Sequence, residues 1–110
     1  MSKIKCAHSK FKYPTRPSWK ELGMSKESVR ELQNGCKAGI YPSETLREAC
    51  GEFKFLEPWI LLSVTKGWSY DFMITKWELR ELERAPVGKT DFYGYRRKFY
   101  YNLDNLLKGK

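Results

Sequence analysis

The sequence predicts a small all-α protein, and three observations support this fold class. Apolar residues recur three and four positions apart in several segments, as on one face of a helix. Serine, proline and glycine stand where such segments begin and end, and no stretch alternates apolar and polar residues as a half-buried strand would. Because 110 residues suffice for one core, we expect a single helical domain over residues 18–110, behind a basic N-terminal arm at residues 1–17.

Basic residues are in excess at both ends of the chain. Twenty-one Lys and Arg against 13 Asp and Glu give a net charge of +8. Residues 1–42 carry nine basic and three acidic side chains, residues 43–84 six and eight, and residues 86–110 six and two. This distribution favours a polyanionic partner such as DNA. Pro14 and Pro17 rule out a continuous helix in the arm, whose basic residues are Lys3, Lys5, Lys10, Lys12 and Arg16.

Two helices are predicted in the first half. Ser18 and Glu21 stand at the spacing of a capping box, in which two residues satisfy each other's backbone N–H groups. Ser25 is a candidate N-cap for a helix that ends at Gly35. Ser43 is the candidate N-cap of a second helix, whose apolar stripe consists of Leu46, Ala49, Cys50 and Phe53.

The middle of the chain predicts a buried helix and then a longer one. Pro58 is tolerated in a first helical turn and Gly67 would end that helix. Its residues 59–62 are all apolar, so we expect this helix to be buried on every side. Ser69 can cap the next helix, which we expect over residues 70–84. The predicted core contains Trp59, Ile60, Leu62, Met73, Trp77, Phe92, Phe99 and Leu103.

A last helix is predicted from Thr90 to about Leu107, after a break at Pro86 and Gly88. One of its faces is apolar and the other carries tyrosine and arginine. A helix that enters the major groove of DNA needs this division, because its apolar face anchors it while residues near its N-terminus meet base edges and phosphates. Gly94 either permits close approach to a duplex or only weakens the helix. The candidate DNA-binding residues are Lys89, Thr90, Asp91, Tyr93, Arg96, Arg97 and Lys98.

From Ile60 onward the chain resembles known DNA-binding proteins, on the segments "LLSVTKGWSYDFM" and "APVGKTDFYGYRRKFYYNL". It is similar to the helix-turn-helix in region 4 of bacterial sigma factors, where a glycine and then Ser-Tyr open the first helix and a short break precedes a basic recognition helix. It resembles more closely small prophage and mobile-element proteins of Gram-positive bacteria, of the RinA/ArpU type of phage late-gene regulators. These end in a motif like residues 88–99 here. The resemblance implies a helix-turn-helix over about residues 68–107, although "ITKWELRELERA" is longer than the usual scaffold helix and turn.

Neither a membrane span nor a signal peptide is predicted. No run of about 18 apolar residues occurs, and residues 1–12 lack an apolar segment of the kind that signal peptides contain. We therefore expect a cytoplasmic protein of a bacterial host cell with no membrane partner. Cys6, Cys36 and Cys50 are expected to be free thiols. Together with His8 they lack the tight Cys-x₂₋₄-Cys pair of structural zinc sites, so we expect neither a metal nor another cofactor.

No pattern predicts an enzyme. The acidic residues between positions 76 and 84 alternate with basic ones, and surface pairing on a helix explains them. A nuclease centre made of Asp71, Glu78 and Asp91 is the weaker alternative. Stacking on single-stranded bases is an alternative to core packing for the tryptophans, but we prefer packing for Trp59 and Trp77.

Two functions are consistent with these observations. The first is a DNA-binding transcriptional regulator of phage or mobile-element origin that acts on double-stranded DNA. The second is an interaction module that uses the same scaffold to bind host RNA polymerase or a defence protein, as an anti-CRISPR-like inhibitor would. Composition and spacing predict neither an oligomeric state nor a target DNA sequence.

Overall fold

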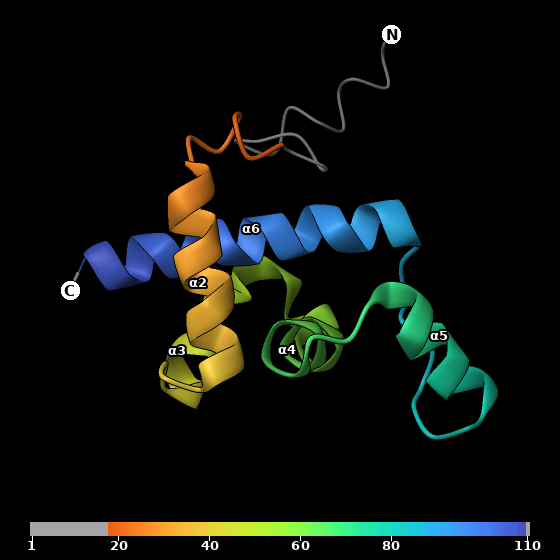
Figure 1. Cartoon of the computed structure of the whole chain (residues 1–110). Coiled ribbons are helices and arrows are strands. Elements are labelled where there is room, and N and C mark those ends of the chain that lie inside the picture. Colours follow the sequence, from red (N-terminus) through yellow and green to blue (C-terminus); the bar gives the residue numbers. More distant parts are fainter. Residues whose placement is uncertain (1–17, 110) are drawn as a thin grey trace, which may run out of the picture.

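A computed structural model describes residues 18–109, and these residues form helices and connecting segments without a strand (Figure 1). The all-α prediction is therefore confirmed. The arm predicted at residues 1–17 lies outside the described residues. The elements are α2 (Lys26–Ala38), α3 (Ser43–Ala49), the short 3-10 helix η1 (Gly51–Leu56), α4 (Glu57–Lys66), α5 (Tyr70–Glu78) and α6 (Lys89–Lys108).

The longest helix, α6, is the element around which the others pack. It spans 20 residues, and α2, α3, α5 and η1 all contact it. Figure 1 shows α2 crossing α6, and α5 standing near the end at which α6 begins. Phe92, Phe99 and Leu103 of α6 are completely buried, as are Leu56 and Ile60 from the opposing elements. Burial of each such side chain contributes roughly 1.5–3 kcal/mol.

Several predicted helix boundaries are confirmed. The N–H of Ser18 donates to Oε1 of Glu21 at 2.8 Å, and the N–H of Glu21 donates to Oγ of Ser18 at 3.2 Å, which is the reciprocal pair of a capping box. The hydroxyls of Ser25 and Ser69 accept backbone N–H groups three residues on, at 3.1 and 3.0 Å, and so cap α2 and α5. Gly67 ends α4 with a φ of +74°, in the left-handed region that suits glycine.

Two boundaries in the first half differ from the prediction. The first helix does not end at Gly35 but continues until Gly39, which takes the left-handed conformation (φ +73°). Gly35 is buried inside the helix, and a Cβ there would lie 2.6 Å from the ring of Tyr41. Its lack of a side chain therefore makes room for that ring. Ser43 is the first residue of α3, and Pro42 occupies the N-cap without a side-chain hydrogen bond.

The helix that starts at Tyr70 is shorter than predicted and ends well before Arg84. Arg80 follows it with a φ of +64°, which is incompatible with a continuing right-handed helix. The indole N–H of Trp59 donates to the carbonyl of Glu83 at 3.0 Å. The chain must therefore turn back toward α4 within residues 79–88, and a helix that continued in a straight line would not reach this bond.

Two predictions about the core also need correction. Trp77 is 38% exposed rather than buried. Because α5 ends early, the loop covers its ring, with the Arg84 guanidinium 4.9 Å from the ring centroid. The helix α4 is not buried on every side, since Trp59 and Leu62 are only partly covered. The other predicted core residues are buried, namely Ile60, Met73, Phe92, Phe99 and Leu103.

Candidate nucleic-acid interface

Tyr70 joins the start of α5 to the start of α6. Its backbone N–H donates to the hydroxyl of Tyr93 at 2.9 Å, and its own hydroxyl donates to the carbonyl of Val87 at 2.8 Å. Its ring centroid lies 5.6 Å from that of Phe92. Only 7% of Tyr70 is exposed. These contacts fix the first turns of the two helices against each other.

The helices α5 and α6 therefore meet at their N-terminal ends, and residues 79–88 lead back from the far end of α5 (Figure 1). Both helices of the expected helix-turn-helix are present. Their connection is longer than the short break that the resemblance implies. A helix-turn-helix over about residues 68–107 stays a prediction.

The first turn of α6 is open to solvent. Lys89 and Thr90 are exposed, and the N-cap Gly88 provides no side-chain hydrogen bond to this turn. Nζ of Lys89 lies 2.9 Å from Oδ2 of Asp71. The hydrogen bond and the charge of Asp71 raise the pKa of Lys89. Both side chains are more than half exposed, so water and salt screen this pair and a phosphate can compete for the lysine.

Arg96 lies in a different environment, although it belongs to the same predicted set. Its guanidinium carbon is 4.7 Å from the ring centroid of Tyr93, and its Nη1 donates to Oγ of Ser63 at 2.9 Å. Ser63 belongs to α4 and is 2% exposed. Our sequence argument assumed that Arg96 would be solvated in the absence of a ligand. The structure instead gives Arg96 a place between α6 and α4.

The middle of α6 is largely covered. From Asp91 to Asp104 every residue is buried or partly buried, including Arg97 and Lys98. Nζ of Lys98 lies 5.7 Å from the ring centroid of Tyr95, and desolvation lowers its pKa. Gly94 is buried, so it does not offer an open stretch of backbone to a duplex in this conformation.

The predicted DNA-binding residues therefore fall into two groups. Lys89 and Thr90 lie together on the exposed first turn. The remaining five, from the second half of that turn onward, are at least partly covered by the protein. They are Asp91, Tyr93, Arg96, Arg97 and Lys98.

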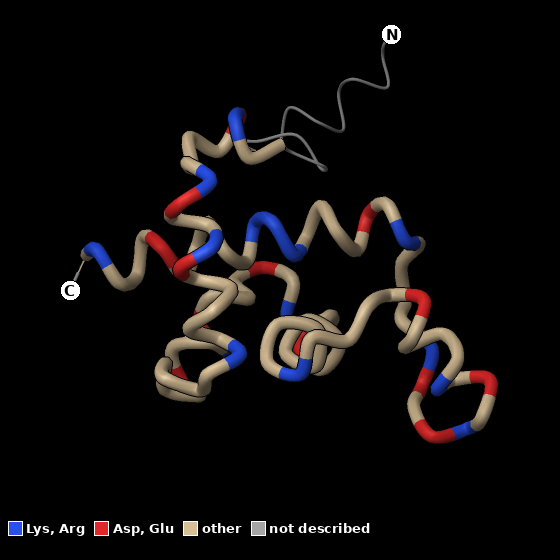
Figure 2. Tube along the Cα trace, viewed as in Figure 1, with Lys and Arg blue, Asp and Glu red and all other residues tan. Residues whose placement is uncertain are grey.

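Charge is distributed unequally between the described domain and the segment before it. Residues 18–109 carry 15 basic and 13 acidic side chains, whereas residues 1–17 carry five basic and no acidic ones. Figure 2 shows both signs interspersed along the described helices. The helical body is therefore close to neutral, and most of the net charge lies in the N-terminal segment and in Lys110.

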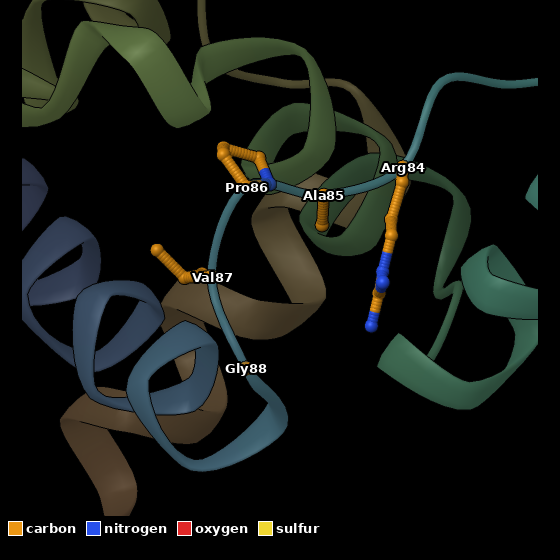
Figure 3. A pocket seen from close by; sticks show the side chains of 5 residues that line it. All are labelled: Arg84, Ala85, Pro86, Val87 and Gly88. Atoms are coloured by element: carbon orange, nitrogen blue, oxygen red, sulfur yellow. The ribbon is translucent and has the colours of Figure 1, made fainter.

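A hollow of about 440 Å³ follows the segment from Arg84 to Gly88, which also lines it (Figure 3). The hydrogen bond from Tyr70 to the Val87 carbonyl holds this segment in place. Arg84 is the only ionisable side chain among the lining residues. The hollow therefore offers no pair of groups that could act as nucleophile and base.

The two described cysteines are buried in the core. Desolvation raises the pKa of Cys36 to about 11 and that of Cys50 to about 12. Both are therefore protonated thiols at neutral pH, and the thiolate is the form that binds metals or attacks substrates. Within residues 18–109, no three His, Cys, Asp or Glu side chains are grouped as a metal site would require. Cys6 and His8 lie outside the described residues.

One surface feature was missed by the sequence interpretation. Trp68, Phe72 and Leu79 form an exposed apolar stripe on α5, on the side away from the predicted core stripe. The signal was present, because positions 68, 72 and 79 have helical spacing. It was overlooked because Trp77 was assigned to the core.

No helix in the described part of the chain is both long and apolar enough to cross a bilayer. No protein-family model matches the chain, and no curated protein or solved structure matches it either. A functional conclusion must therefore come from the chain's own residues.

Proposed function

We propose that this protein binds double-stranded DNA and regulates transcription, with the first turn of α6 at the duplex. The observation that carries the proposal is the exposed position of Lys89 and Thr90 on a turn that Tyr70 holds firmly against α5. Recognition helices read base edges mainly with residues of their N-terminal part. A helix N-terminus also attracts phosphate, because its first N–H groups lack partners within the helix.

Affinity in this proposal comes mostly from charge. The five basic residues before Pro17 and the four basic residues of α6 between positions 89 and 98 supply contacts to phosphates. Each phosphate contact releases counterions, so affinity falls steeply as salt rises. The near-neutral body contributes the scaffold that presents the first turn.

The proposal gives the candidate residues different roles. Lys89 and Thr90 contact the duplex directly, and Arg97 and Lys98 add positive potential to the same helix. Arg96 positions α6 through its hydrogen bond to Ser63. A role in regulating genes of a phage or mobile element is supported by the sequence resemblance alone.

The test compares Lys89→Ala/Thr90→Ala with Lys108→Ala in the full-length chain. Lys108 is a matched control, because it is an exposed lysine at the other end of α6 and pairs with Asp104 at 3.0 Å as Lys89 pairs with Asp71. Binding to a random 20-base-pair duplex is followed by fluorescence anisotropy at two salt concentrations. We expect the double variant to bind about tenfold more weakly, with a salt dependence reduced by about one unit of slope.

Lys108→Ala should bind like the wild type. Equal affinities for all three proteins, with circular dichroism showing intact helices, would reject the first turn of α6 as the interface. Absence of binding by the wild type even at low salt would reject the DNA-binding function itself.

A further inference from the structure

The apolar stripe on α5 consists of Trp68, Phe72 and Leu79. Leu79 is 61% exposed and Phe72 is 42% exposed. Trp68 is partly buried, and its ring centroid lies 4.9 Å from that of Phe72 in an edge-to-face contact. Nζ of Lys76 lies 5.6 and 5.3 Å from the two ring centroids. Three large apolar side chains are thus held on one face of a helix by contacts among themselves.

This stripe faces away from the body of the protein. The opposite side of α5 carries Tyr70 and Met73, which are buried against α6 and the core. Figure 1 shows α5 at the periphery of the molecule, away from α2 and α3. No described element covers Leu79, since residues beyond it turn back along the other flank to bring Glu83 to Trp59.

The charges around the stripe decide which partner fits it. Residues 68–84 contain three basic and four acidic side chains. A nucleic acid or an anionic membrane surface would meet a slightly negative region here and would gain little from it. Lys76 pairs with Glu81 at 2.8 Å beside the stripe, so both signs lie within reach of one interface. A surface of mixed sign is complementary to a second copy of itself, because a two-fold axis brings each charge opposite a different part of the same segment.

We propose that the apolar stripes of two copies of this chain pack against each other across a two-fold axis. The two α5 helices run antiparallel in this dimer, so that Phe72 of one copy meets Leu79 of the other. Acidic residues at the end of each α5 then lie near basic residues of its partner. The interface consists of one short helix from each copy, and interfaces this small are weak. We therefore expect association that depends on protein concentration.

The proposal is independent of DNA binding, because Lys89 and Thr90 do not belong to the stripe. It also makes a specific statement about which residues change their environment. Association should shift the backbone amide signals of residues 68–80, while signals from α3 stay constant.

Sedimentation equilibrium of the full-length chain in the absence of DNA tests the proposal. The average mass should rise from 13.0 kDa toward twice this value as concentration increases over roughly 10 µM to 1 mM, the range of a small, weak interface. Phe72→Gln/Leu79→Gln should stay at the mass of one chain. Ile40→Gln is the matched control, because Ile40 is 66% exposed and lies outside the stripe, and this variant should associate like the wild type.

Amide shifts of the wild type over the same concentration range keep the test decisive if the double variant folds poorly. Shifts confined to residues 68–80 would support the dimer. A wild-type chain that remains a monomer at 1 mM overturns the proposal and leaves a different protein as the occupant of the stripe. Association that persists in the double variant, or amide shifts located elsewhere, overturns it as well.

Discussion

The first turn of α6 and the middle of the same helix carry similar basic side chains in different surroundings. Lys89 pairs with Asp71 in solvent, and both members of this pair are accessible. Arg96 lies between the Tyr93 ring and the buried Ser63 hydroxyl. An exposed pair exchanges its partner for a phosphate at little cost, whereas a buried hydrogen bond must first be broken. A count of basic residues on a helix therefore overstates how many of them are available to DNA.

The largest effect that separates the two regions is expected from Arg96→Met. This substitution keeps most of the apolar stem but removes the donor to Ser63, and leaves a buried hydroxyl without that partner. We expect a loss of about 2 kcal/mol in the free energy of unfolding, as for other hydrogen bonds to charged groups. Urea denaturation measures this loss. A loss within the range of an ordinary surface substitution, about 0.5 kcal/mol, would place Arg96 with Lys89 instead.

A double-mutant cycle sharpens the same comparison. Ser63→Ala in the Arg96→Met background should recover part of the lost stability, because the unpaired hydroxyl is then gone.

A smaller effect is expected from Tyr70→Phe at the junction between α5 and the first turn. The ring contact with Phe92 and the backbone bond to Tyr93 remain, while the hydrogen bond to the Val87 carbonyl is lost. We expect a destabilisation of about 1 kcal/mol, measured in the same urea experiment. An unchanged midpoint would show that this bond does not hold the loop before α6.

Alkaline pH should weaken the buried body before it affects the exposed turn. Burial raises the pKa of Cys36 to about 11 and of Cys50 to about 12, from a model value of 9.0. The unfolded chain therefore loses these protons first as pH rises, so stability is complete below about pH 9 and declines between pH 9 and 11. Thermal unfolding of the wild type and of Cys36→Ala over this range measures the decline, which should be shallower in the variant. Parallel curves would contradict the role of this thiol.

Much of the fold could be predicted because it is encoded locally. Ser25, Ser69 and Gly67 mark helix ends through contacts with residues only a few positions away. The errors arose where distant residues decide the outcome. Gly35 continues a helix because Tyr41 packs on it, and α5 stops early in a chain that must bring Glu83 to Trp59.

The candidate site shows the same limit. The position of Lys89 and Thr90 at a helix start followed from the break at Pro86 and Gly88. The partner of Arg96 did not, since Ser63 is 33 positions away and lies on a helix whose exposed and buried sides the sequence did not distinguish. Helical spacing gives the face on which a residue lies, but the packing of several helices determines what covers that face.

A titration of the isotope-labelled full-length chain with a short random duplex, followed by amide chemical shifts, tests the central claim most directly. We predict that the largest changes occur at Lys89, Thr90 and Asp91, and that those at Arg96 and Phe99 are small, with all changes decreasing as salt is raised. Changes centred on the middle of α6 or on the apolar stripe of α5, or no changes at millimolar duplex and low salt, would contradict the claim that the first turn of α6 meets DNA.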